Sequence, residues 1–111
     1  MKTFALMLAL ALSDKPQEVV ATAYTARCQG CSGITASGKT ADYRKRYIAA
    51  NWNWPIGTCV LVELDGKWVR YTVQDRGPVK SNHIDLLVRT TAEAREFGRQ
   101  RVRVKSCPKK K

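Results

Sequence analysis

The chain has few acidic residues and no long apolar segment. Its 111 residues include 9 Asp and Glu against 20 Lys and Arg, a formal net charge of +11. So basic a chain is drawn to polyanions such as nucleic acid, anionic lipid or wall polymers, and the charge alone does not choose among them. The apolar run at 4–12 is shorter than the ~20 residues that a membrane-spanning helix needs. We expect one domain and no membrane span.

The same apolar run predicts export. Lys2 precedes it, residues 11–13 (Ala-Leu-Ser) offer a small-residue cleavage site, and Asp14 opens the next segment. These features are typical of a secretory signal, here residues 1–13. The alternative is an N-terminal strand or helix packed on the domain. No cysteine directly follows the run, which argues against a lipid anchor.

The chain has only four cysteines: Cys28, Cys31, Cys59 and Cys107. In a small exported domain they indicate two disulfides, with three possible pairings. We expect Cys28–Cys31 as a local clip and Cys59–Cys107 as a long staple, because Cys59 begins one predicted strand and Cys107 ends another. A four-thiolate zinc site is the competing interpretation, weakened by the lack of a second C-x-x-C pair. A redox C-x-x-C is the third.

Local patterns predict a mostly β chain. Asp65-Gly66 predicts a tight hairpin, and residues 90–97 predict a helix capped by Thr90 and ended by Gly98. Alternating or β-branched segments predict strands at 19–24, 59–64, 67–73 and 101–105. We expect residues 14–20 to be a linker, 21–107 the domain and 108–111 a basic tail.

Two parts of the sequence echo each other. Residues 55–58 lead into one predicted strand as residues 96–99 lead into another, each through an apolar residue, a glycine and a short polar gap. Two similar halves predict a small closed barrel with pseudo-twofold symmetry. Closure would hide the strand edges that so small a sheet otherwise exposes.

Two aspartates lie in unlike surroundings a short loop apart. Asp75 has Arg76 beside it, whereas Asp85 lies inside the apolar run 84–88. A neighbouring cation keeps a carboxylate ionised, and an apolar setting holds another protonated. Carboxyls whose pKa values are pushed apart are typical of acid/base chemistry near neutral pH. The structural alternative, in which Asp75 caps a turn and Asp85 satisfies backbone amides, stays open.

Seven short segments occur in one characteristic order. They are 21–24 (ATAY), 33–38 (GITASG), 48–50 (IAA), 55–58 (PIGT), 73–77 (VQDRG), 84–86 (IDL) and 96–98 (EFG). With them the chain resembles, over about residues 21–105, the three-aspartate (3D) domain of bacterial and phage cell-wall proteins. The resemblance implies a six-stranded double-psi β-barrel with one or two short helices. Lytic transglycosylase A, rare lipoprotein A and expansin-like proteins share this barrel.

The resemblance implies cleavage of the peptidoglycan glycan strand without water. A carboxylic acid protonates the oxygen between N-acetylmuramic acid and N-acetylglucosamine, and the carboxylate then takes the proton of the sugar's own 6-hydroxyl, which closes a 1,6-anhydro ring. By resemblance to lytic transglycosylase A, Asp85 is this catalytic residue and Asp75 orients groups or stabilises the oxocarbenium-like state. Tyr24 and Thr35 map near the groove, and Arg76 either holds Asp75 or touches the substrate.

The sequence departs from the family pattern at its first aspartate. Asn51 stands there, and its amide can bond a sugar hydroxyl but cannot titrate. Rare lipoprotein A has a histidine at this place and a glutamate where Lys39 lies here, so its acid/base set is largely missing. Asp42 is the nearest substitute, unless it is a plain surface carboxylate.

The histidine and the tryptophans each allow two interpretations. His83 tunes the site or binds wall phosphate, or it is a surface histidine. Trp52 and Trp54 stack on sugar rings beside Asn51, or they pack in the core. For Trp68, inside an alternating strand, we expect packing.

We therefore expect a lytic transglycosylase that binds glycan strands and anionic wall polymers, is secreted, periplasmic, envelope-bound or virion-borne, and works as a monomer without cofactor or metal. The alternative is a non-catalytic, expansin-like wall-binding module, for which Asn51 is the best support. A third hypothesis is a nucleic-acid binder that uses its cations and tryptophans. The export-like start and the cysteines argue against it.

Overall fold

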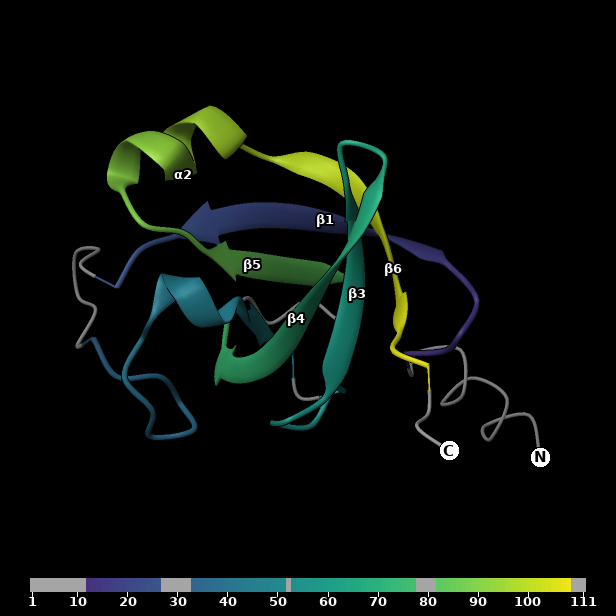
Figure 1. Ribbon diagram of the computed structural model, residues 1–111, viewed down its shortest axis with the longest axis horizontal. Helices are drawn as coiled ribbons and strands as arrows, with labels where there is room; N and C mark the ends of the chain where they lie inside the picture. The colour runs from purple at the N-terminus through teal and green to yellow at the C-terminus, as the bar shows by residue number, and fades with distance from the viewer. Residues whose placement is uncertain (1–11, 27–32, 52, 78–81, 109–111) are drawn as a thin grey trace.

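The computed structural model describes residues 12–26, 33–51, 53–77 and 82–108. Within them, six strands close into a barrel in the order β1-β5-β2-β4-β3-β6 (Figure 1). The strands are β1 (Gln17–Tyr24), β2 (Tyr47–Ala50), β3 (Cys59–Leu64), β4 (Lys67–Arg76), β5 (His83–Leu87) and β6 (Gln100–Ser106). A short 3-10 helix, η1 (Tyr43–Lys45), and one α-helix, α2 (Thr91–Phe97), complete the fold. The mostly β, six-stranded barrel is confirmed.

The strand pairings repeat in two halves. β1 runs parallel to β5 and β2 runs parallel to β4, whereas the other neighbours are antiparallel. If β1 is exchanged with β4, β2 with β5 and β3 with β6, the same set of parallel and antiparallel pairings results. Gly57 and Gly98, which precede the equivalent strands β3 and β6, both have positive φ, +94° and +66°. The predicted pseudo-twofold barrel is therefore present.

The hairpin and the helix begin and end where their sequence signals lie. Asp65 and Gly66 have φ of 51° and 77°, as a two-residue turn between right-handedly twisted strands requires. Thr90 Oγ1 accepts a hydrogen bond of 3.1 Å from the amide of Glu93, and the amide of Gly98 donates to the carbonyl of Ala94 at 3.0 Å. Among the described residues, no helix is long and apolar enough to cross a membrane.

The core fills the inside of the barrel with alternate residues of its strands. Each large aliphatic side chain buried there contributes about 1.5–3 kcal/mol. The core residues are Val19, Ala21, Ile48, Ala50, Trp54, Val60, Val62, Val73, Ile84, Leu86, Val102 and Val104. Trp54, 3% exposed, is thus a core residue and not a sugar platform. Trp68 is partly buried and is not a core residue; its ring lies against two cations, with Lys105 Nζ 4.3 Å and the Arg103 guanidinium 5.7 Å from the ring centroid. Trp52 lies outside the described residues.

The predicted linker at 14–20 is wrong in its second half. β1 begins at Gln17, opposite Val104, because the side chain of Val19 is buried in the core. Leu12 also packs against the core, and the carbonyl of Ser13 accepts a hydrogen bond of 2.8 Å from the amide of Ser106. The signal segment and the basic tail stay predictions, since residues 1–11 and 109–111 lie outside the described residues.

The long disulfide is confirmed. Cys59, the first residue of β3, is bonded to Cys107, the residue after β6, across 48 residues of sequence. This bond excludes a four-thiolate zinc site, because two of its four sulfurs are used. In the chain-entropy account, a cross-link of this span stabilises a fold by about 4 kcal/mol. Cys28 and Cys31 lie outside the described residues.

Candidate functional site

A β-bulge in β4 decides where Asp75 points. Ile48 of β2 pairs with Val73, and the next residue, Ala49, pairs with Asp75, so Gln74 is an extra residue in β4. Val73 is fully buried in the core. Strict alternation from Val73 would point Asp75 inward as well. The extra residue turns it to the outer face, as bulges near functional sites commonly do.

The two aspartates lie in one row across four neighbouring strands. Ala49 of β2 pairs with Asp75 of β4 on one side and with Asp85 of β5 on the other, and Asp85 pairs in turn with Thr22 of β1. A Cβ atom on Gly77 would lie 2.9 Å from the Cβ of Ala49, closer than real contacts allow. Because residues 49 and 77 are both small, the chain after β4 can pack closely against Ala49, which lies between Asp75 and Asp85.

Three donors fix the carboxylate of Asp75. Oδ1 accepts 2.9 Å hydrogen bonds from the amides of Ala36 and Arg76, and Oδ2 accepts one of 3.1 Å from the hydroxyl of Tyr24. Burial, followed by the charge of Asp75, raises the pKa of Tyr24 far above its ordinary value. Tyr24 therefore stays a hydrogen-bond donor across the physiological pH range.

Thr35 supports the loop that carries Ala36 to Asp75. Its buried Oγ1 lies 2.8 Å from Ser37 Oγ and accepts a 3.2 Å hydrogen bond from the amide of Lys39. The amide of Ser37 donates to the carbonyl of Gln74 at 3.0 Å, which joins this loop to the bulge. The hydroxyl of Thr35 is thus engaged within its own turn, which does not favour the predicted contact with a ligand.

Asp85 lies half-buried next to a hydrogen-bonded chain of two side chains. Thr22 Oγ1 donates to Asp85 Oδ1 at 3.0 Å and lies 2.9 Å from His83 Nε2. Because a hydroxyl has one hydrogen, His83 Nε2 is then the donor to Thr22. Burial raises the pKa of Asp85, and the charge of Asp75 adds to the rise, whereas the Thr22 hydrogen bond and His83 lower it. The raised pKa agrees with the expectation for an acid/base residue.

Arg76 and Asn51 shape the loop after β2. Arg76 Nη1 donates to the carbonyls of Trp54 (2.8 Å), Asn51 (3.0 Å) and Ala50 (3.5 Å), and the main-chain amide of Arg76 donates to Asp75. Asn51 Oδ1 accepts a 3.0 Å hydrogen bond from the amide of Asn53, an Asx turn. Both side chains therefore hold this loop in shape.

Asp42 is not a substitute acid. It caps η1, accepting 3.0 Å hydrogen bonds from the amide and the Nε of Arg44. The hydrogen bond from the Arg44 side chain lowers the pKa of Asp42, the opposite of what a proton donor at neutral pH requires. Among the described residues, no three His, Cys, Asp or Glu side chains gather as metal ligands would.

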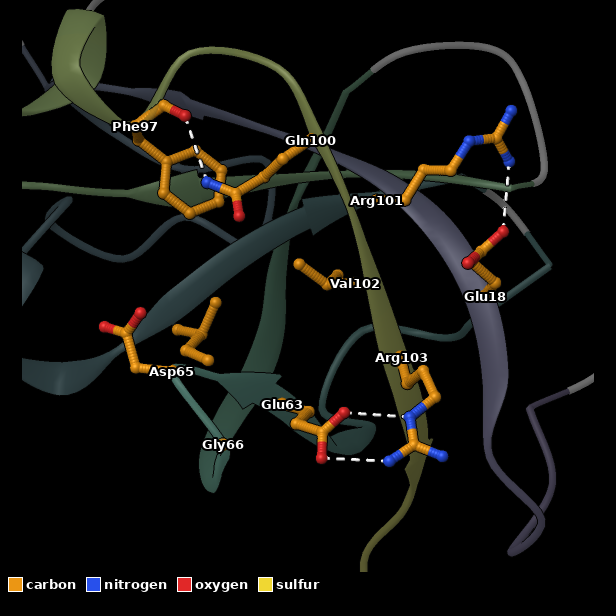
Figure 2. A pocket seen from close by; sticks show the side chains of 10 residues that line it. Glu18, Glu63, Asp65, Gly66, Phe97, Gln100, Arg101, Val102 and Arg103 are labelled. Atoms are coloured by element: carbon orange, nitrogen blue, oxygen red, sulfur yellow. Dashed lines mark hydrogen bonds and ion pairs between the residues drawn. The ribbon is translucent and has the colours of Figure 1, made fainter.

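A hollow of about 460 Å³ on β6 and the β3–β4 hairpin contains none of the predicted site residues. Figure 2 shows two ion pairs between strands in it, Arg101 with Glu18 at 3.1 Å and Arg103 with Glu63 at 2.8 Å. Its polar groups bond mainly to one another, so it does not extend the Asp75–Asp85 row.

Sequence reasoning missed Thr22. It belongs to the quoted segment 21–24 and precedes Tyr24 by two residues, so strand alternation places both on the face that carries the carboxyls. No sequence pattern could have identified the Ala36 amide as a donor to Asp75, because every residue except proline has the same main-chain N–H group.

The closed barrel with its two parallel pairs related by a pseudo-twofold axis is a double-psi β-barrel. The Streptomyces papain inhibitor has the same fold, with a TM-score of 0.63 and 22% identity over 86% of this chain and 96% of that one. A Clavibacter michiganensis expansin mutant, solved in complex with cellohexaose, superposes with a TM-score of 0.61 and 19% identity, over 87% of this chain and 52% of its own.

Sequence relatives occur in Bacillus subtilis (strain 168). The SPbeta prophage-derived uncharacterized protein YorM is 42% identical over 98 residues, 81% of this chain and 41% of its own. The cell wall-binding protein YocH is 38% identical over 99 residues, 84% of this chain and 33% of its own. The chain thus spans less than half the length of either relative. No protein-family model matches the chain.

Proposed function

We propose that this barrel binds the glycan strand of bacterial peptidoglycan across the face that carries Asp75 and Asp85, and cleaves it as a lytic transglycosylase. The 3D-like segments and a relative whose name describes cell wall binding support the substrate. A half-buried carboxyl with a raised pKa, in one row with a second carboxylate, supports the chemistry. The position and surroundings of Asp85 are the observation on which the activity rests.

Asp85 acts twice in the proposed reaction. Protonated, it donates its proton to the glycosidic oxygen as the bond from that oxygen to the muramyl C1 breaks. Its carboxylate then takes the proton of the muramyl 6-hydroxyl, whose oxygen bonds to C1, so the residue is regenerated and no water is consumed. Asp75, held by Tyr24 and two main-chain amides, faces the developing positive charge of the ring.

A non-catalytic wall-binding module is the second candidate. The oxygens of Asp75 already accept three hydrogen bonds, and the amide oxygen of Asn51 closes a turn. This leaves Asp85 as the one carboxyl of the row without such a set of donors. The same fold also occurs in a papain inhibitor, so the barrel by itself does not imply an enzyme.

The proposed place of action is the cell envelope. The apolar start and a relative named for cell wall binding support it, and the prophage origin of YorM fits a phage-encoded protein equally well. The cleaved signal at 1–13 belongs to this proposal. The contacts of Leu12 with the core and of Ser13 with Ser106 favour the alternative, in which this end of the segment packs on the domain.

Mass spectrometry of a sacculus digest tests the proposal. We expect soluble muropeptides lighter by one water than those that lysozyme releases, and none from Asp85→Asn. Sedimentation of both proteins with the sacculi, without soluble fragments from either, would instead establish the binding module. Full activity in Asp85→Asn would remove this residue from the mechanism.

A further inference from the structure

The strand β3 lies across the barrel from Asp85. In the closed order β1-β5-β2-β4-β3-β6, β3 is the third neighbour of β5 in both directions. Its outer surface therefore points away from the strand that carries Asp85. The same holds for β6 and for the part of β4 that pairs with β3, residues 67–72, which ends before Asp75. The proposed function uses no side chain on this side of the molecule.

Strand alternation places a row of cations on the outside of β6. Val102 and Val104 belong to the core. The side chains between and beside them, those of Arg101, Arg103 and Lys105, therefore point outward. Residues two apart on a strand are separated by roughly 6.4–6.8 Å, so the three cations form an evenly spaced line. Such a line matches a linear polyanion better than a single anion.

A second column of outward side chains comes from β4. Leu61 and Glu63 are the outward residues of β3, on either side of a buried valine, and they pair with Arg70 and Trp68. Leu61 also pairs with Lys105 of β6, so Arg70 and Lys105 flank one leucine on strands roughly 9.4–9.8 Å apart. The basic face, as we call it, consists of Arg70, Arg101, Arg103 and Lys105 with Trp68 and Glu63 between them.

Two carboxylates offset part of the charge of the basic face. Glu18 pairs with Arg101 at 3.1 Å and Glu63 pairs with Arg103 at 2.8 Å (Figure 2). Four cations against two carboxylates leave the surface positive. The side chains of Arg101 and Arg103 are 70% and 54% exposed, and exposed ion pairs are weak. A phosphate can therefore contact both arginines without breaking a buried pair.

Arg70 and Lys105 are the two cations of the basic face most available to a ligand. Among the residues that the structure describes, neither forms an ion pair. Arg70 Nη1 donates to the disulfide sulfur of Cys59 at 3.1 Å, and sulfur is a weak acceptor. Lys105 Nζ and the Arg103 guanidinium both lie against the ring of Trp68. This cation–π attraction holds the two cations in place, which lowers the entropic cost of binding an anion.

The chemistry of the basic face favours a polymer that carries phosphates but neither bases nor acyl chains. Single-stranded nucleic acid is held by stacking of its bases on aromatic rings, and the ring of Trp68 already lies against two cations. A membrane surface is held by apolar side chains that insert among the lipids. Among the described residues, the exposed large hydrophobic ones are Ile34, Tyr43 and Ile56, and they lie outside β3, β4 and β6.

We propose that the basic face binds the phosphodiester backbone of an anionic wall polymer, a chain of polyols joined by phosphates. Arg70 and Lys105 bind its phosphates at one end of the face, and Arg103 and Arg101 continue the contact along β6. The glycan strand occupies the opposite side, so one molecule contacts both polymers of the wall. The inference rests on the proposed function for the location at the wall, but no contact of the face depends on Asp85.

Binding of poly(glycerol phosphate) to the full chain, measured over a range of salt concentrations, tests the basic face. Arg70→Gln/Lys105→Gln should weaken binding about tenfold at low salt, because contacts to two phosphates are lost. The slope of log affinity against log salt should fall by about 1.4, or about 0.7 for each cation on a single-stranded polyanion. Lys105→Gln alone should lower the slope by about half as much.

Lys45→Gln/Arg95→Gln is the matched control, since it removes the same charge from exposed residues of η1 and α2. It should leave the salt slope unchanged and alter the affinity only by the small effect of net charge. Thermal melting verifies the folding of each variant, because Arg70 contacts the disulfide.

Two further probes compare the alternative partners. We expect the polymer to bind at least as tightly as an oligothymidylate with the same number of phosphates, and more tightly than phosphatidylglycerol vesicles at equal phosphate concentration. Tighter binding of the DNA would assign the face to nucleic acid, and equal or tighter binding of the vesicles would assign it to lipid. Either result overturns the proposal.

The outcomes for the basic face and for the proposed function are separate. No loss of affinity in Arg70→Gln/Lys105→Gln, or an equal loss in the control, overturns the basic face as the binding surface. Muropeptide release from sacculi stripped of the anionic polymer tests the proposed function alone, and it should be unchanged in Arg70→Gln/Lys105→Gln. Absence of release by the unaltered protein, with binding of the polymer intact, overturns the proposed function and leaves the basic face standing.

Discussion

At the scale of single residues, the environment of Asp85 sets opposing effects against each other. Burial and the charge of Asp75 raise its pKa, while the Thr22 hydrogen bond and His83 lower it, and burial dominates. The apolar neighbours in sequence predicted this burial, since Ile84 and Leu86 point into the core and hold β5 in the barrel. Thr22 could not be placed beside Asp85 without the parallel register of β1 and β5.

Thr22→Val should raise the pKa of Asp85 further. Valine keeps the shape of threonine but removes the hydroxyl that donates to Oδ1 at 3.0 Å, a bond that favours the charged carboxylate. Titration of the Asp85 carboxyl carbon by NMR measures the shift directly. An identical titration curve in the variant would mean that this hydrogen bond does not form in solution.

Asp85→Asn should stabilise the protein at neutral pH. The folded-state pKa of Asp85 is raised above the ordinary value of 3.8, so the folded state binds this proton more tightly than the unfolded state. The cost of ionising Asp85 is therefore absent below pH 3.8 and sets in as pH rises through the folded-state pKa. Denaturant unfolding is measured below pH 3.8 and near neutral pH. The free energy of unfolding of the variant should exceed that of the parent only near neutral pH. A gain of equal size in acid would assign it to another cause.

At the scale of elements, the bulge at Gln74 and the contact of Gly77 with Ala49 position the row of carboxyls. The strand patterns predicted β1, β3, β4 and β6, because alternation and the Asp-Gly turn are local properties of the sequence. They did not identify β2, because all four of its residues are buried and so do not alternate. They did not identify β5 either, because its alternation covers only His83 to Leu86 before Leu87, which is also buried. The bulge left no signal either, because it shows only in the pairing of β4 with β2.

Gly77→Ala should destabilise the fold by about 1–3 kcal/mol, the usual cost of an extra methyl in a packed place. The new Cβ would lie 2.9 Å from the Cβ of Ala49. Adding Ala49→Gly removes the clash and should recover part of the loss, although glycine in a strand has an entropic cost. Urea unfolding of both single variants and the double variant measures this coupling. Simple additivity of the two losses would show that the residues do not touch.

At the scale of the whole molecule, closure of the barrel brings residues together that no local pattern connects. The echo before β3 and β6 predicted the two halves, and these strands are indeed neighbours. Their pairing also explains why Cys59 and Cys107 meet, since one begins β3 and the other follows β6. Four cysteines allow three pairings, so the number of cysteines alone could not identify this bond. The pairing of β3 with β6 was also needed.

Loss of the Cys59–Cys107 bond should lower the free energy of unfolding by about 4 kcal/mol, because the bond joins residues 48 apart and restricts the unfolded chain. The variant Cys59→Ser/Cys107→Ser isolates this bond and leaves Cys28 and Cys31 unchanged. Guanidinium unfolding, with the midpoint and the slope fitted separately, measures the loss. The folded spectrum and the pKa of Asp85 should be unchanged, because the row of carboxyls lies on β4, β2, β5 and β1 and the bond lies between β3 and β6. A loss of well under 1 kcal/mol, or a shifted Asp85 titration, would contradict this separation of the disulfide from the site.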